Sequence, residues 1–458
     1  MKTKAINHTI RTAVLFLPVL FLFTSCEKLL DPTPNDSIPS EYAIQDAKGV
    51  EKAIIGSYSA LQYSSYYGRN YLVMGDISTN NLVWTGTSPD YNQIYNNSIL
   101  ADNLIVRDMW YTIYDAVNRV NNVIAKLPEI GDMSQEAKNN ALGECNFLRG
   151  LHHFNLVRLW GAVPVKLIPT TGNLNDLQVA RDEVPVVYRQ VIKDLSSAEL
   201  QLLDGNVTGR ATKSATRALL AKVYLTRYNM LKNDLDLDSA LFYANMLIDN
   251  PGFSMESDFN TLFMPEANNE SIFEITFNPQ DNNTLAVYYF SKLMAGRYEF
   301  APSDTLMNSF EAEDLRRDFS IKSDSAGFLY GYKYRDMTTG TDRVYVSRLA
   351  EMYLIRAEVN IYKEGPVAGI QADINMIRNR AGLGDTPAED YAALFVALQN
   401  ERLHEFAFEG QRWFDLIRTD LAILVLPNVL SRDQYLFPVP MAELQANTNP
   451  DMFQNPGY

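Results

Sequence analysis

The sequence predicts a mostly α-helical protein, built on degenerate helix pairs of the tetratricopeptide type and carrying long irregular loops with a few short strands. Three observations predict this class. Apolar side chains recur at helical spacing along much of the chain, two helix pairs repeat a similar rhythm, and stretches rich in Asn, Asp and Gly separate them. Because 47% of the 458 residues are hydrophobic, the chain can form a core and is not expected to be disordered.

The net charge of −15 argues against one class of partner. It results from 40 Lys and Arg against 55 Asp and Glu. Proteins that bind nucleic acid usually show a basic excess, because contacts to phosphates dominate their affinity. We therefore expect no nucleic-acid partner, and the acidic net charge slightly favours neutral or cationic ligands over acidic glycans.

Residues 1–25 predict a lipoprotein signal peptide. A basic start precedes an apolar stretch from Ala13 to Phe23, which is too short to cross a bilayer. Small residues then lead to Cys26, a pattern that resembles a bacterial lipobox, although Phe23 stands where an aliphatic residue is usual. We expect Cys26 to be acylated and to anchor the chain. The alternative is an ordinary secreted protein in which this cysteine is incidental.

The chain after the signal peptide is expected to have three parts. Residues 26–40 hold the lipidated cysteine and a stalk, because three prolines lie there among polar residues. Residues 41–260 form an N-terminal helical region that carries the ligand loops. Residues 261–458 form a C-terminal region.

Helical periodicity defines the first elements of the body. Apolar side chains at i, i+3, i+4 and i+7, beginning at Trp110, predict a helix that stops at Pro128. Two further helices are expected over residues 135–159 and 184–204, each followed by a glycine. Each of these helices is expected to bury one apolar face.

Two helix pairs then follow with a tetratricopeptide-like rhythm, over residues 221–247 and 350–377. In each pair a core tyrosine follows an alanine three positions earlier on the first helix, and a second apolar helix follows after a turn. Stacked pairs of this kind present one long face to a partner.

The segments 60–103 and 253–345 are expected to be long loops with few strands. The first is rich in Tyr, Asn, Ser and Gly and shows little periodicity, and the second is dense in Asn, Asp, Gly and Pro. Within the second, Ser271 to Phe277 alternates like a strand, and Arg343 to Val346 is another short candidate. Loops on a rigid helical scaffold are where binding residues tend to lie.

No motif for a cofactor or a metal is found. The sequence lacks a phosphate-binding loop, a dinucleotide fingerprint, a nucleophile elbow and a CxxC pair. Only four histidines occur, and the adjacent His152 and His153 are interpreted as packing or surface residues. The acidic run from Asp234 to Asp238 lacks the glycine and glutamate of a calcium loop, so we expect a helix turn capped by Asp238 or Ser239.

One group of carboxylates leaves an enzymatic alternative open. Glu401, Glu405 and Glu409 are spaced to share one face of a helix. Paired carboxylates serve glycosidases, but a salt-bridged structural helix is the favoured interpretation. Cys145 is interpreted as a small buried apolar residue.

The C-terminal third resembles the SusD/RagB family of nutrient-binding outer-membrane lipoproteins. The matching stretches are RLAEMYLIRAEV (348–359), INMIRNRAGL (374–383), ERLHEFAFEGQRWFDLIR (401–418) and YLFPVPMAELQANTNPDMFQNPGY (435–458), and FLRGLHHFNLVRLWGAVPV (147–165) matches more loosely. The resemblance implies a mostly helical fold with four repeat-like helix pairs. It also implies a position on the outer face of the outer membrane and delivery of oligosaccharides, or in a minority of members peptides, to a SusC-like TonB-dependent transporter. Members are not enzymes, and these motifs are structural in the family.

The resemblance also points to ligand residues in the N-terminal loops. A starch-binding member uses an arc of aromatic residues with an arginine and an asparagine. Here Arg69 and Trp84 stand in comparable order and separation, followed by Tyr91 and Asn92. Flat rings suit the C–H faces of sugars, and guanidinium and amide groups suit their hydroxyls. The further candidates are Tyr67 and Tyr288, with their neighbours Tyr66 and Tyr289. The alternative for Trp84 is packing within the loop core.

The sequence therefore predicts a surface lipoprotein that captures oligosaccharides without cofactor or catalysis. Peptide uptake is the nearest alternative. A surface glycoside hydrolase, or a scaffold that binds only the transporter, is a more distant one.

Overall fold

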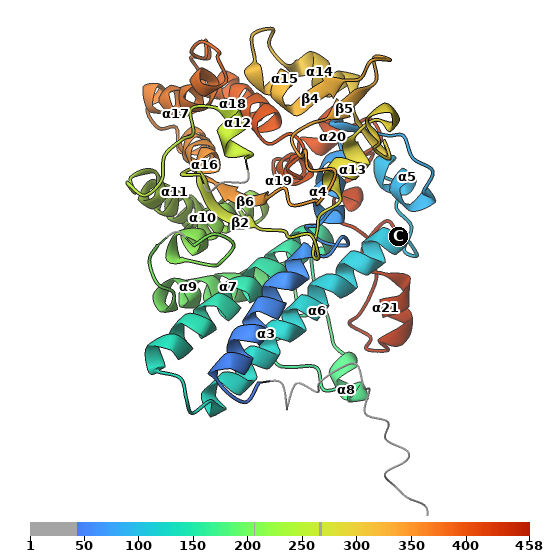
Figure 1. Cartoon of the computed structure of the whole chain (residues 1–458), viewed down its shortest axis with the longest axis vertical. Helices are drawn as coiled ribbons and strands as arrows, with labels where there is room; N and C mark the ends of the chain where they lie inside the picture. The colour runs from blue at the N-terminus through green and yellow to red at the C-terminus, as the bar shows by residue number, and fades with distance from the viewer. Residues whose placement is uncertain (1–43, 206, 265–267) are drawn as a thin grey trace, which may run out of the picture. The chain divides into compact units, whose positions relative to one another are not determined.

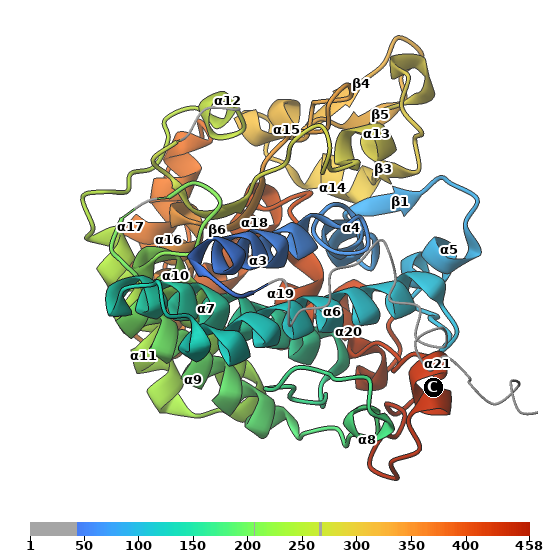
Figure 2. The ribbon, with the colours of Figure 1, turned by 60° about the horizontal axis from the view of Figure 1, so that its bottom comes forward.

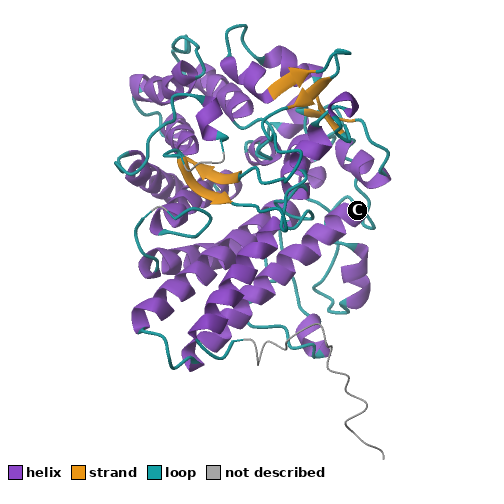
Figure 3. Ribbon diagram, viewed as in Figure 1, coloured by secondary structure: helices purple, strands orange, loops and turns teal. Residues whose placement is uncertain are grey.

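The computed structural model describes residues 44–205, 207–264 and 268–458 (Figure 1). The predicted signal peptide, Cys26 and the stalk lie outside these described residues. The described chain is mostly helical, as predicted, and its strands are few and short (Figure 3). Among the described residues, no helix combines the length and the hydropathy needed to span a membrane.

Long helices form the lower part of the molecule as drawn in Figure 1. The predicted helix at Trp110 begins at Leu104, where the Asn103 side chain accepts hydrogen bonds from two backbone N–H groups of the first turn. The next helix is buried on every side from Leu148 to Val157, so the other helices pack around it. The long helices are α3 (Ala47–Ser59), α6 (Leu104–Lys126), α7 (Gln135–Trp160) and α9 (Val184–Gln201).

The two tetratricopeptide-like pairs are confirmed, and they are neighbours in space. The first consists of α10 (Lys213–Leu231) and α11 (Asp234–Ile248), and the second of α16 (Leu349–Tyr362) and α17 (Val367–Arg380). Ala240 and Ala244 of α11 share one hydrophobic cluster with Met352 and Ile355 of α16. Small alanines let the helices approach closely, and α18 (Tyr391–Glu405) continues the stack.

The predicted cap of α11 is wrong. Asn233, not Asp238 or Ser239, precedes the helix, and its side chain accepts a hydrogen bond from the Leu235 N–H. The acidic run therefore lies inside the first turns, where carboxylates favour the positive end of the helix dipole. Asp236 is buried and pairs with Arg227.

The segment 60–103 contains more regular structure than predicted. It holds α4 (Asn70–Ile77), β1 (Leu82–Trp84) and α5 (Pro89–Tyr95). All eight residues of α4 are buried, so the helix shows no apolar face in the sequence. A proline at its first position starts α5.

The segment 253–345 combines short helices with strands that belong to three antiparallel pairs. The predicted strands pair as β2 (Ser271–Ile275) with β6 (Val344–Arg348), and β1 pairs with β3 (Phe300–Pro302), with Trp84 opposite Phe300. The third pair is β4 (Ile321–Ser323) with β5 (Leu329–Gly331). The short helices are α12 (Phe259–Leu262), α13 (Leu285–Tyr289), α14 (Asp304–Ser309) and α15 (Leu315–Ser320).

The C-terminal segment closes against the long helices. The Trp160 indole N–H of α7 donates to the Pro438 carbonyl at 3.0 Å, and Asn455 donates to the Trp160 carbonyl. One hydrophobic cluster contains both Val50 and Met452, so the two expected regions of the body share a core. The remaining helices are α8 (Leu174–Leu177), α19 (Arg412–Arg418), α20 (Ala422–Val425) and α21 (Met441–Ala446), and the short 3-10 turns are η2 (Ala60–Gln62), η3 (Leu127–Glu129), η4 (Lys292–Met294) and η5 (Arg432–Tyr435).

The three glutamates near residue 405 are buried and paired, as the structural interpretation predicts. Arg348 holds Glu405 and Glu409 at 2.8 Å each, and Arg316 holds Glu401 at 2.8 Å. The expected common helix is wrong in one respect, because α18 ends at Glu405 and Glu409 follows in a turn. Since all three carboxylates are under 8% exposed and ion-paired, they do not present an open acid–base pair.

Cys145, His152 and His153 are all buried in α7. Burial raises the pKa of the Cys145 thiol well above its usual value, so the thiol stays protonated. Burial lowers the pKa of His152 to about 3 and that of His153 to about 4, so both rings are neutral. These residues pack, as predicted for the histidines and for the cysteine.

Candidate ligand-binding site

The structure brings four of the predicted ligand residues together around Phe300. Trp84, at the end of β1, lies 5.0 Å from Tyr91 and 5.2 Å from Phe300, measured between ring centroids. Tyr91 meets Phe300 edge to face at 5.1 Å, and Tyr288 stacks on Phe300 at 5.9 Å. Figure 2 shows β1 and β3 between α13 and α5, the elements that supply these rings. We call this group, together with Arg69, the aromatic cluster.

Arg69 belongs to the cluster and has polar partners but no carboxylate partner among the described residues. Its guanidinium carbon lies 4.2 Å from the centroid of the Tyr288 ring. The Nε group donates to the Asn70 side chain at 3.0 Å, and Nη1 donates to the Thr284 hydroxyl at 3.3 Å. The same Asn70 oxygen accepts from the Tyr91 hydroxyl at 2.7 Å. Asn70 therefore holds the arginine and the tyrosine in a fixed relation.

Sequence reasoning missed several members of the site. Besides Asn70, Thr284 and Phe300, they include Arg297, which lies 4.6 Å from the Tyr288 ring and is paired with Glu299. Arg297 and Glu299 lie two residues apart just before β3, and neither was predicted as a ligand residue. Two guanidinium groups thus pack against one tyrosine ring, an arrangement that cation–π attraction favours.

Trp84 is half-buried, so part of its indole is accessible and part is packed. Gly86 lies against the ring: a Cβ added at Gly86 would lie 2.3 Å from Cη2 of the indole. A glycine is needed here because a larger residue would displace the ring. The packing interpretation of Trp84 therefore holds in part, and because the ring is partly accessible it stays a predicted ligand residue.

Burial fixes the protonation of Tyr91. It raises the pKa of this phenol to about 12, and Arg69 opposes part of the shift. The hydroxyl is therefore neutral at physiological pH and serves as the donor to Asn70.

Other predicted ligand residues lie elsewhere. Tyr67 is only 4% exposed, and its hydroxyl accepts a hydrogen bond from Asn155 in the core, so we remove it from the candidate set together with the fully buried Tyr66. Tyr289 is also buried: it packs on Tyr334 and meets Phe300 from the core side, at 6.1 Å between ring centroids.

Asn92 follows Tyr91 on α5 and is exposed. Its side-chain oxygen accepts from Asn96 at 3.1 Å, and its carbonyl accepts from the same amide at 2.8 Å. Asn92 is accessible at the edge of the cluster and stays a predicted ligand residue.

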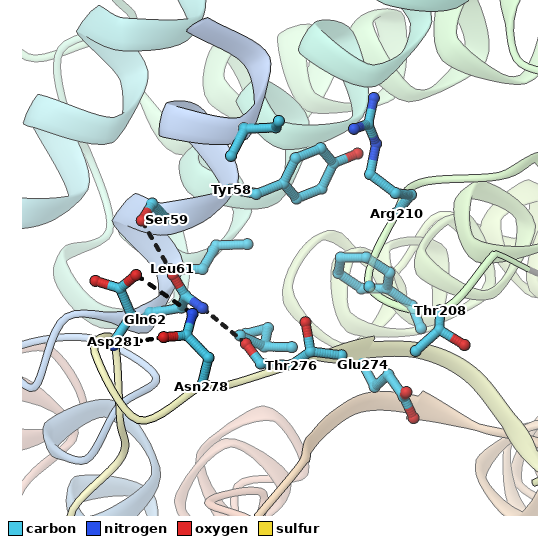
Figure 4. A pocket seen from close by; sticks show the side chains of 14 residues that line it. Tyr58, Ser59, Leu61, Gln62, Thr208, Arg210, Glu274, Thr276, Asn278 and Asp281 are labelled. Carbon is cyan, nitrogen blue, oxygen red and sulfur yellow. Dashed lines mark hydrogen bonds between the residues drawn. The ribbon is translucent and has the colours of Figure 1, made fainter. Parts of the chain in front are cut away.

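A pocket of about 250 Å³ lies at the end of α3, between β2 and residues 208–210 (Figure 4). Several of its polar side chains are already engaged: Gln62 donates to the Thr276 carbonyl at 2.8 Å, and Arg210 pairs with Glu144. A pocket whose hydrogen-bonding groups are satisfied internally offers few donors to a ligand. The aromatic cluster is therefore the better candidate.

Metal or cofactor binding receives no support from side-chain grouping. Within the described part of the chain, no three His, Cys, Asp or Glu side chains are placed to hold one metal ion. The chemistry that the aromatic cluster offers is stacking and hydrogen bonding.

Comparisons with known proteins agree on one family. A family model described as "SusD family" matches residues 322–426, and one described as "Starch-binding associating with outer membrane" matches residues 28–225. Two SusD-like proteins of Formosa agariphila, P25 and P2, are 25% and 26% identical to the chain. The P25 match covers 96% of this chain and 97% of that protein, and the P2 match covers 97% and 99%.

Solved structures show the same fold. A SusD superfamily protein from Bacteroides vulgatus superposes with a TM-score of 0.82 at 24% identity, over 90% of this chain and 99% of that one. A laminarin-binding SusD-like protein gives a TM-score of 0.78 at 22% identity, over 90% and 100%. Surface glycan-binding protein A from Bacteroides thetaiotaomicron, solved with laminarihexaose, gives 0.78 at 20% identity, over 90% and 100%.

Proposed function

We propose that the chain, which belongs to the SusD family, is a surface glycan-binding protein that captures oligosaccharides with its aromatic cluster. The observation that carries this proposal is the grouping of Trp84, Tyr288 and Arg69 on a rigid scaffold. The relatives named for laminarin and surface glycans support the ligand class.

The cluster suits a sugar for physical reasons. The accessible part of the Trp84 indole offers an apolar face to ring C–H groups, and we expect about 1 kcal/mol per stacked ring by analogy with aromatic pairs. Arg69 offers guanidinium donors to hydroxyls. Because Asn70 and Thr284 already orient Arg69, little side-chain entropy is lost on binding.

The finer parts of the function are proposals of the same kind. We propose that acylated Cys26 tethers the chain to the outer membrane facing outward, and that a SusC-like TonB-dependent transporter receives the captured sugar. The family description that mentions the outer membrane supports the location. We propose no catalytic role, since the carboxylates considered for a glycosidase are buried in ion pairs.

Isothermal titration calorimetry tests the ligand class. The chain from residue 27 onward retains every described residue and lacks the predicted lipid anchor. We expect heat from one class of oligosaccharide in a panel of laminarihexaose, maltohexaose and cellohexaose, and no release of reducing ends. Heat from a mixture of peptides alone would contradict the glycan proposal and favour peptide uptake. Reducing ends that appear over time would favour a hydrolase.

A further inference from the structure

A second pocket lies outside the aromatic cluster, between α12 and α15. These two helices lie near the top of Figure 1. Its volume is about 560 Å³, within the range of roughly 300–1,000 Å³ that ligand sites occupy. None of the residues that line it belongs to the aromatic cluster. Its wall includes Phe259, Asn260, Phe319, Lys322, Tyr332 and Arg335. We call it the Arg335 pocket.

Arg335 is held between two rings and has no carboxylate partner among the described residues. Its guanidinium carbon lies 4.4 Å from the Phe319 ring centroid and 4.6 Å from that of Tyr332. Its Nε group donates to the Tyr332 carbonyl at 3.0 Å, and Nη1 reaches Asn260 only at 3.5 Å. The group is therefore oriented by stacking while its outer nitrogens have hydrogen-bonding capacity left.

Other arginines in the C-terminal half of the chain do pair with carboxylates. Arg348 and Arg378 each contact two or more carboxylates at 3.0 Å or less. Arg380, which also lines the Arg335 pocket, pairs with Glu270 and with Glu405. Burial lowers the pKa of Arg335, and the charges of Asp342 and Asp258 oppose only part of that shift.

Both aspartates that line the pocket bind groups other than Arg335 and Lys322. Asp318 is committed to Arg317 at 2.8 Å, and Asp258 caps α12 by accepting from the Asn260 N–H at 2.8 Å. Lys322, on β4, is exposed and forms no ion pair within the described residues. Its ammonium nitrogen lies 5.8 Å from the Tyr332 ring. Lys322 and Arg335 thus line one cavity as two cations that form no ion pair among the described residues.

We propose that the Arg335 pocket is a second ligand site, which binds a sugar that carries a carboxylate or sulfate group. A guanidinium fork suits the paired oxygens of either group, and binding would replace the missing ion pair. Lys322 adds a second positive charge at the rim, and Asn260 adds an amide for a neighbouring hydroxyl. The net charge of the chain disfavours acidic glycans only at long range, whereas this pocket sets the charge at contact distance.

Calorimetry on the chain from residue 27 tests the pocket, with galacturonic acid tetramer as the carboxylate probe and galactose 6-sulfate as the sulfate probe. We expect at least one probe to bind the parent protein. The Arg335→Gln variant should bind that probe at least tenfold more weakly. The matched control is Arg107→Gln, which removes an exposed arginine on α6 paired with Asp108 and should change nothing.

Two further readouts separate this site from the aromatic cluster. Trp84→Ala should leave binding of the acidic probe unchanged, and Arg335→Gln should leave binding of neutral hexaoses unchanged. The proposal is overturned if neither probe binds the parent, if Arg335→Gln binds the probe like the parent, or if Trp84→Ala abolishes binding of the acidic probe. Thermal unfolding of each variant confirms that the fold is retained. Failure of the neutral hexaoses alone would contradict the proposed function of the cluster but not this site.

Discussion

Single side chains fix the position of α4, the helix at whose start the ligand residue Arg69 lies. Asp76, near the end of α4, accepts hydrogen bonds from the Asn81 side chain at 2.7 Å and from the Gly410 N–H at 2.9 Å. Burial raises the pKa of this carboxyl to about 7 despite both bonds, and Lys333 opposes the shift in part. Because Asn70 and Arg69 begin the same helix, Asp76 links the position of the ligand residues to the C-terminal segment.

The raised pKa of Asp76 predicts a pH dependence of stability. Between about pH 4 and pH 7 the carboxyl is ionised when the chain is unfolded but protonated when it is folded, so this group's contribution to stability falls as pH rises. Asp76→Asn removes the titration. The free energy of unfolding of the variant relative to the parent should therefore rise by about 3–4 kcal/mol across this interval.

Urea unfolding of both proteins at several pH values measures this difference. Comparing variant with parent cancels the histidines, whose lowered pKa values give the opposite slope below about pH 6.5. Parallel stability curves for the two proteins would contradict the assignment.

The residues of the site could be predicted only in part. Arg69, Trp84, Tyr91 and Tyr288 meet in the structure, although more than 200 positions separate the first from the last. Asn70 carried no signal, because its role is to orient neighbours and not to offer an aromatic face.

Among the elements, the contact between the end of β6 and the end of α18 depends on a network of buried ion pairs. Arg348 at the end of β6 is 1% exposed and contacts Glu270, Glu405 and Glu409, each at 2.8 Å. Replacing it by Met leaves buried carboxylates with too few partners. We expect Arg348→Met to lower the free energy of unfolding by about 3–5 kcal/mol.

Chemical unfolding monitored by circular dichroism measures the loss. The matched control is Arg432→Met, which removes an exposed ion pair with Asp420 and should leave stability nearly unchanged. Equal stability of Arg348→Met and the parent would show that the network adds no net stability.

Periodicity predicted the long helices and the repeat pairs, because most of them bury one apolar stripe against a neighbour, whereas α7 is buried on every side from Leu148 to Val157. It missed α4 because that helix is buried on all sides. The predicted cap of α11 was at least five positions too late, because several Asp residues follow the true cap, Asn233. The spatial contact between the two repeat pairs also could not be predicted from the sequence, because about a hundred residues separate them.

At the scale of the whole molecule, a helical scaffold holds two chemically distinct surfaces. The aromatic cluster presents rings with one guanidinium that has no carboxylate partner among the described residues, and the Arg335 pocket presents two cations that form no ion pair there. The net charge of the chain does not reveal this contrast, because local side-chain pairing sets the charge that a ligand meets. A ligand long enough to reach both surfaces would gain avidity without a new contact.

The central claim, that the aromatic cluster captures the glycan, is tested most directly by calorimetry of the Trp84→Ala variant. The ligand is the neutral hexaose that gives the largest heat with the parent, and Phe242→Ala, which removes an exposed ring on α11, is the control. We predict that Trp84→Ala weakens binding by about 1 kcal/mol, roughly fivefold, or abolishes it, while its circular dichroism spectrum shows that the fold is retained. Binding equal to that of the parent and of Phe242→Ala would contradict the claim.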